Sequence, residues 1–151
     1  MASTVLALVS AILLALQPAA KPDFSGEWKM NPSKSNFGGL PGPSSVVRSI
    51  THAEPSLTIV ETQVADVGET SSTRKYTTDG TPMTFTAQGT EVRGQATWDG
   101  PTLVVVSSVD AAALTFNDKM TLSADRKTLT SAVHLSTPQG DVDFLIVFEK
   151  Q

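Results

Sequence analysis

The stretch that decides the fold is residues 113–150, which read ALTFNDKMTLSADRKTLTSAVHLSTPQGDVDFLIVFEK. Apolar side chains recur at every second position in three successive runs: Leu114, Phe116, Met120 and Leu122; Leu129, Val133 and Leu135; Val142, Phe144, Ile146 and Phe148. A period of two with one apolar face is typical of β-strands that cover a core. Turn residues separate the runs at 124–126 and 138–140, so we expect consecutive antiparallel strands.

The same pattern extends back to residue 25, which predicts an all-β domain. Asp79-Gly80 and Asp99-Gly100 are typical of tight hairpin turns, because both residue types accept positive φ. Short connections favour an up-and-down meander, and its closure into one barrel of about 8–10 strands removes exposed sheet edges. The irregular segment 31–44, rich in Gly and Pro, is expected to form a loop over one end of the barrel. The strands are predicted near residues 25–30, 45–53, 56–64, 69–78, 81–87, 90–98, 102–109, 113–122, 127–136 and 141–150.

Residues 1–20 read differently from the rest of the chain. They carry no charged side chain and include an apolar run from Val5 to Leu16. That run is too short to span a bilayer but is typical of a secretory signal. We therefore expect residues 1–20 to be a cleaved signal peptide and residues 21–151 to form one exported domain, periplasmic or extracellular, without stable membrane insertion. A buried N-terminal helix and an uncleaved anchor are the alternatives.

Composition excludes several functional classes. Eleven basic and fifteen acidic residues give a net charge of −4 with no basic run, which disfavours nucleic-acid binding. The absence of cysteine excludes disulfides, thiol nucleophiles and thiolate metal sites. Only His52 and His134 remain for metal chemistry, and we interpret His52 as an exposed strand end and His134 as solvated. No hydrolase or phosphate-binding motif is present, so we expect no cofactor, no metal, no catalytic residues and a monomer.

Polar residues on apolar faces are the main functional signal. Asp118 lies within the Leu114–Leu122 series, and Arg74 shares a strand face with Tyr76. A buried charge is costly unless it is paired or used. The sequence therefore predicts a cavity for an acid-headed amphipathic ligand, lined by Arg48, Arg74, Tyr76, Phe85, Phe116 and Asp118. A bulge that turns Asp118 outward, or a purely structural ion pair, is the alternative.

Two motifs carry a resemblance to known families. Gly26-Glu27-Trp28 resembles the Gly-x-Trp motif of lipocalins, fatty-acid-binding proteins and avidins, which implies that Trp28 closes one barrel end beneath a basic residue of the last strand, here Lys150. Residues 24–38, with 76–80, 98–100 and 122–125, look like segments of exported bacterial proteins with lipocalin-like domains. Arg74-Lys75-Tyr76 is similar in spacing to the Arg-x-Tyr that holds a carboxylate in fatty-acid-binding proteins, although it lies on an earlier strand.

Three functional hypotheses follow from these observations. The first is an exported barrel that binds a small apolar or amphipathic molecule, possibly bearing a carboxylate, in its interior. The second is a filled barrel that acts as an envelope structural or protein-interaction module, which a cavity below about 300 Å³ would favour. The third is a barrel-lumen isomerase or cyclase that uses Asp118 or Tyr76 for proton transfer, which would require a strongly shifted pKa in a cleft.

Overall fold

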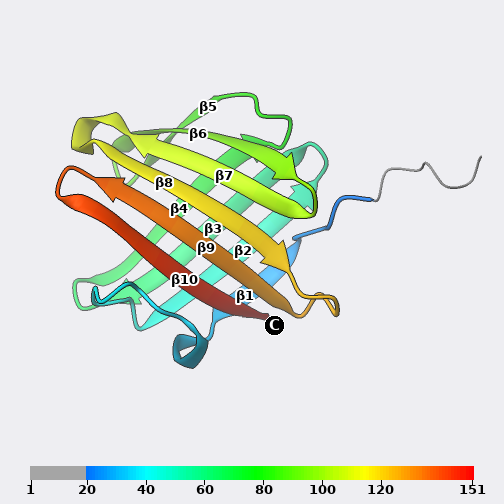
Figure 1. Cartoon of the computed structure of the whole chain (residues 1–151), viewed down its shortest axis with the longest axis horizontal. Coiled ribbons are helices and arrows are strands. Elements are labelled where there is room, and N and C mark those ends of the chain that lie inside the picture. The colour runs from blue at the N-terminus through cyan, green and yellow to red at the C-terminus, as the bar shows by residue number, and fades with distance from the viewer. Residues whose placement is uncertain (1–19) are drawn as a thin grey trace, which may run out of the picture.

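The computed structural model describes residues 20–151 (Figure 1). The predicted signal peptide therefore lies, apart from Ala20, outside the described residues. Export, cleavage and a monomeric state remain predictions. Residues 20–151 contain no helix that is both long and apolar enough to cross a membrane.

Ten strands and two short 3₁₀ helices make up the fold. The elements are β1 (Gly26–Met30), η1 (Pro32–Lys34), β2 (Ser45–Ala53), β3 (Ser56–Ala65), β4 (Gly68–Thr77), β5 (Met83–Ala87), β6 (Thr90–Asp99), β7 (Thr102–Val109), η2 (Asp110–Ala112), β8 (Leu114–Leu122), β9 (Thr128–Thr137) and β10 (Gly140–Lys150). Every predicted strand is present, with its ends within two residues of those expected. Gly80 and Gly100 adopt φ of +83° and +58°, as the predicted Asp-Gly turns require.

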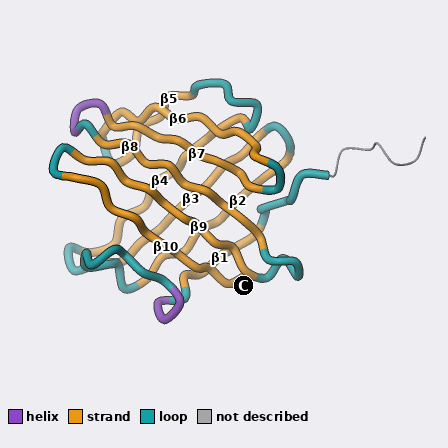
Figure 2. The backbone as a smooth tube through the Cα atoms, in the orientation of Figure 1, coloured by secondary structure: helices purple, strands orange, loops and turns teal. Residues whose placement is uncertain are grey.

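The strands form one antiparallel sheet in the order β4-β3-β2-β1-β10-β9-β8-β7-β6-β5. Each strand pairs with its neighbour in sequence except at β4 and β5, and β1 also pairs with β10, so that Trp28 lies opposite Lys150. This pairing wraps the meander into a barrel, with turns at its two ends (Figure 2). The predicted up-and-down barrel is confirmed, and it is nearly closed: the pairing stops between β4 and β5.

Side-chain contacts bridge the seam between β4 and β5. The rings of Tyr76 and Phe85 meet edge to face with centroids 5.6 Å apart, and the Tyr76 hydroxyl lies 3.0 Å from Ser107 Oγ. Tyr76 packs directly over Gly94, where a Cβ would lie 2.6 Å from Tyr76 Cε1. The seam is thus a packed contact that replaces a row of backbone hydrogen bonds.

The two ends of the barrel differ. At one end Phe24, Trp28, Leu57, Leu103 and Leu129 are almost completely buried and fill the lumen. The other end carries the β3–β4, β5–β6, β7–β8 and β9–β10 turns, on the left of Figure 1. The segment between β1 and β2 also lies at this end, as predicted for residues 31–44, and Phe37 packs against Phe144 with ring centroids 6.0 Å apart. We call these the closed end and the mouth.

Candidate functional site

A cavity of about 430 Å³ opens toward solvent at the mouth. Its walls are mainly apolar and come from the mouth-side halves of β2 to β10 together with the loop residues Phe37 and Pro43. The large wall side chains are Phe37, Phe85, Val92, Phe116, Val133 and Phe144. The strands have one apolar face because of their alternating sequence, and barrel closure turns that face into the wall of the cavity.

The floor of the cavity is charged. Arg48, Glu61, Arg74 and Asp118 all line it, and they project from β2, β3, β4 and β8. One inward position further toward the closed end on these strands, Ile50, Ile59, Tyr76 and Met120 are buried. We refer to Arg48, Glu61, Arg74 and Asp118 as the charged cluster. It lies where the packed half of the lumen gives way to the hollow half.

Glu61 connects the two arginines. Its Oε2 accepts hydrogen bonds from Arg48 Nε at 2.7 Å and from Arg74 Nη2 at 3.2 Å, and Arg48 Nη2 lies 2.7 Å from the same oxygen. The Arg48 guanidinium also stacks 4.5 Å above the centroid of the Phe148 ring. Arg48 is therefore fixed by an ion pair on one edge and by an aromatic ring on its face.

Asp118 occupies the other side of Arg48. Its Oδ1 accepts a hydrogen bond from the Ser131 hydroxyl, and its Oδ2 lies 3.7 Å from Arg48 Nη1. Arg48 Nη1 also donates to Ser131 Oγ at 3.3 Å. β8 runs without a bulge at this point, since Asp118 pairs in register with Val105 and Val133. The alternating pattern, and not a bulge, thus sets the direction of the Asp118 side chain.

The pKa values of the two buried carboxyl groups shift in opposite directions. Burial raises the pKa of Asp118 above its ordinary value, and the attraction of Arg48 and the Ser131 hydrogen bond offset only part of this effect. Burial also acts on Glu61, but Arg48 and Arg74 outweigh it and lower the pKa of Glu61. The difference follows from geometry, because Glu61 bonds to two guanidinium groups and Asp118 faces one at longer range.

Arg74 has unused hydrogen-bonding capacity. Its Nη2 bonds to Glu61, but its Nε is buried without a hydrogen-bond partner. A buried donor without a partner costs about 1–3 kcal/mol. Burial lowers the pKa of Arg74, but Glu61, Tyr76 and Asp118 more than compensate and raise it, so the group stays charged. Arg74 therefore brings a charged guanidinium with one unpartnered, buried donor to the floor of the cavity.

Five of the six ligand-binding residues predicted from the sequence line the cavity: Arg48, Arg74, Phe85, Phe116 and Asp118. Tyr76 does not. It points inward as expected, but it lies one layer below the cavity with its hydroxyl bonded to Ser107. The resemblance to an Arg-x-Tyr carboxylate clamp therefore does not extend to this tyrosine.

Sequence reasoning missed Glu61. The signal was available, because Glu61 continues the inward series Leu57 and Ile59 on its strand. Like Asp118, a carboxylate on an apolar strand face predicts a charged group that points into the barrel. The sequence did not show the ion-pair partner of Glu61, because Arg48 becomes its neighbour only when β2 and β3 pair.

Trp28 and Lys150 meet at the closed end. Lys150 Nζ lies 5.3 Å from the centroid of the Trp28 ring, and the Trp28 indole donates to the Phe24 carbonyl at 2.9 Å. This contact belongs to the packed half of the lumen, and neither residue lines the cavity.

The interpretation of His52 as an exposed strand end was wrong. His52 is buried, because Phe24 and Trp98 pack against its ring with centroids 6.0 and 5.9 Å away. Its Nδ1 accepts from the Phe24 backbone N–H at 3.2 Å, and its Nε2 lies 2.7 Å from Glu54 Oε1. His52 thus anchors the segment before β1 to the closed end. His134 is half exposed beside Asp143, in agreement with its expected solvation.

Metal binding has no support in the described part of the chain. Among residues 20–151, no three His, Asp or Glu side chains converge as they would around a metal ion. The polar groups of the cavity form an ion-pair network, which suits a hydrogen-bonding organic ligand.

Comparison with known proteins shows the fold alone. No protein-family model and no curated protein sequence matches the chain. The structure is similar to that of secretory abundant heat soluble protein 4 from Ramazzottius varieornatus, with a TM-score of 0.64, 13% identity, and coverage of 89% of this chain and 99% of that chain. It is also similar to zebrafish ileal bile acid-binding protein complexed with cholic acid (0.60, 17%, 85% and 98%). A third similar structure is fatty-acid-binding protein 1 from Echinococcus granulosus (0.58, 14%, 84% and 96%). These similarities show a shared fold, which in this chain is an up-and-down barrel of ten strands.

Proposed function

We propose that this protein carries a small amphipathic molecule in its barrel, with an acidic head group on Arg74 and an apolar body toward the mouth. The buried and unpartnered Arg74 Nε on the floor of an apolar cavity is the observation that carries the proposal. A ligand carboxylate or a similar acceptor would satisfy this donor with a charge-assisted hydrogen bond. The apolar wall would cover the rest of the molecule.

The size of the cavity supports a carrier over a filled barrel. Its volume of about 430 Å³ exceeds the roughly 300 Å³ at which ligand pockets usually begin. Two of the three similar proteins described above are named for binding a bile acid or a fatty acid, and both classes combine a carboxylate with a large apolar body.

Catalysis is not part of the proposal. The pKa of Asp118 is shifted by burial, as a proton-transfer group would require, but Ser131 and Arg48 already engage its two oxygens. Tyr76, the other candidate for proton transfer, does not line the cavity. We also propose that the mature chain is exported, as its first twenty residues predict.

The test is a calorimetric titration with dodecanoate. Replacement of Arg74 by Ala should weaken binding by about tenfold or more, the equivalent of one lost charged hydrogen bond. The matched control is Arg93→Ala at the mouth, where Arg93 pairs with Asp110 at 3.0 Å in an exposed position. Its affinity should stay close to that of the wild type.

A second measurement needs no assumed ligand. The molecular mass of protein recovered from the cells that make it is measured in the native and in the denatured state. A native excess that disappears on denaturation would be the mass of a carried molecule. If dodecanoate, dodecanol and cholate all fail to bind and the two masses agree, the carrier proposal is overturned and the filled barrel replaces it.

A further inference from the structure

Resting on the carrier function proposed above, we infer that the barrel takes up an acidic ligand together with one proton, which is held by Asp118. The consequence is a carrier that loads more readily as pH falls and unloads as pH rises.

The charged cluster is already balanced. Arg48 and Arg74 supply two positive charges, and Glu61 and Asp118 supply two negative charges when both are ionised. An ionised carboxylate on Arg74 would leave one negative charge in excess at the floor. An uncompensated charge in such a place costs several kcal/mol. Proteins avoid this cost by neutralising a titratable group, so ligand binding should be accompanied by proton uptake.

Asp118 is the group placed to accept the proton. Every charged side chain that faces it comes from across the lumen: Arg48 on β2, Glu61 on β3 and Arg74 on β4. On its own side, the neighbouring strands present Val105 from β7 and Val133 and Ser131 from β9. Among the described residues 20–151, Arg48 is the single cation within ion-pair distance of its carboxylate, at 3.7 Å.

Glu61 is the poorer acceptor because it holds both arginines. Protonation of Glu61 would weaken three contacts between nitrogen and oxygen at 2.7 to 3.2 Å. Protonation of Asp118 leaves its contact with Ser131 in place, since a hydroxyl group can donate or accept. The pKa of Asp118 is raised by burial and that of Glu61 is lowered by the arginines, so the geometry and the electrostatics agree.

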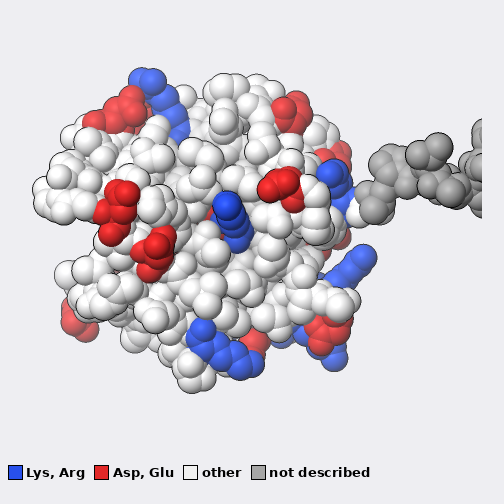
Figure 3. All heavy atoms as spheres, in the orientation of Figure 1, with Lys and Arg blue, Asp and Glu red and all other residues white. Residues whose placement is uncertain are grey.

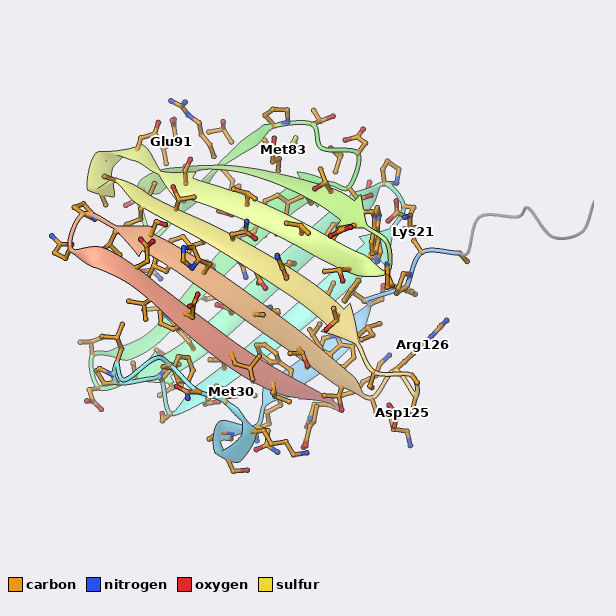
Figure 4. The ribbon with its side chains drawn as sticks, viewed as in Figure 1. Lys21, Met30, Met83, Glu91, Asp125 and Arg126 are labelled. Atoms are coloured by element: carbon orange, nitrogen blue, oxygen red, sulfur yellow. The ribbon has the colours of Figure 1, made fainter. Side chains whose placement is uncertain are left out.

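The mouth favours entry of the neutral acid over the anion. Among residues 20–151, its turns, strand ends and β1–β2 segment carry two cations, Lys34 and Arg93, and six carboxylates, those of Asp66, Glu69, Glu91, Asp110, Asp141 and Asp143. Acidic side chains are visible at the left-hand end of the face in Figure 3, and Figure 4 places Glu91 at this end and Lys21 at the other. A rim with an excess of negative charge sets up a potential that disfavours anionic ligands.

The wild-type experiment is isothermal titration calorimetry with dodecanoate at one pH in two buffers, phosphate and Tris, whose heats of ionisation differ. The difference in apparent enthalpy gives the number of protons taken up for each ligand bound, and we expect close to one. Affinity should fall by about tenfold per pH unit between the pKa of Asp118 in the free and loaded protein. In the free protein the pKa of Asp118 lies above its ordinary value of 3.8 because the group is buried. Dodecanol, which has no charge, should bind without a buffer effect.

Two variants locate the proton. Asp118→Asn imitates the protonated side chain, so it should bind dodecanoate without proton uptake and with an affinity that no longer depends on pH. Asp99→Asn makes the same chemical change at an exposed turn of the closed end and should keep the wild-type uptake.

Three results would overturn the inference, and they separate it from the carrier proposal. If dodecanoate binds the wild type with the same enthalpy in both buffers, the carrier proposal stands and the inferred proton uptake is refuted. If proton uptake persists in Asp118→Asn, Asp118 is not the group that takes up the proton. If neither dodecanoate nor dodecanol binds the wild type, both proposals fail together. The wild-type measurement remains decisive should Asp118→Asn fold poorly.

Discussion

Replacement of Glu61 by Gln should destabilise the barrel more than any other single change at the cavity floor. The substitution keeps the size of the side chain and removes the negative charge that Arg48 and Arg74 share. Loss of one partner from a buried ion pair costs about 3–5 kcal/mol. The side chains of Glu61 and Arg74 are 21% and 20% exposed, so solvent screens part of the loss. We therefore expect a decrease of about 2–4 kcal/mol in the free energy of unfolding.

The sign of the pH dependence follows from the lowered pKa of Glu61. Because the folded state holds this proton less tightly than the unfolded state, the contribution of Glu61 is complete above its ordinary pKa of 4.5. It is lost as the pH falls through the lowered pKa of the folded state. The difference in stability between wild type and Glu61→Gln should therefore be largest near neutral pH and should shrink in acid.

Urea unfolding followed by tryptophan fluorescence measures this difference, because Trp28 is completely buried in the folded barrel. The expected loss corresponds to a midpoint lower by roughly 1.5 M urea. Glu27→Gln is the matched control, since Glu27 is exposed on β1. A loss below about 1 kcal/mol at neutral pH, or an equal loss at pH 7 and pH 3.5, would refute the reasoning about the shared charge.

Two further predictions concern the seam and the outer surface. Gly94→Ala should lower the free energy of unfolding by about 1–3 kcal/mol, because the new methyl displaces the buried Tyr76 ring from the seam. Thermal or urea unfolding measures this loss, and an unchanged midpoint would show that the ring moves freely. The hydrogen bond to Asp143 raises the pKa of His134, so nuclear magnetic resonance titration should place it above the ordinary 6.5 and Asp143→Asn should lower it, whereas an unchanged value would contradict the role of this hydrogen bond.

The sequence predicted the fold well because alternation in the chain is a local property. In each strand the period of two predicts which face points inward, and each Asp-Gly pair predicts a reversal of the chain. Neither signal depends on which strands finally meet. The pairing of β1 with β10 is the step that closes the barrel, and the Gly-x-Trp resemblance at Trp28 indicated it in advance.

The site was predicted less completely, since it depends on distances across the lumen. Arg48 and Asp118 were assigned to the interior from their own strands, and both lie there. Their ion pair at 3.7 Å joins residues 70 positions apart, and no local pattern predicts it. Tyr76 shows the same limit, because its face was predicted but its depth below the cavity was not. The interpretation of His52 was wrong for a related reason, because the aromatic rings that cover it come from the segment before β1 and from β6.

The difference between the two ends of the barrel has a consequence for engineering. Trp28, Phe24 and Leu129 hold the closed end together without touching the cavity, whereas Phe116 and Phe144 line the cavity and are only partly buried. The cavity lining can therefore be changed in one half of the molecule while the other half keeps the barrel folded. The loops of the mouth, like the variable loops of other binding scaffolds, can be lengthened or randomised to present a new recognition surface. A chain without cysteine adds the convenience that a single introduced thiol would report on one chosen position of the cavity.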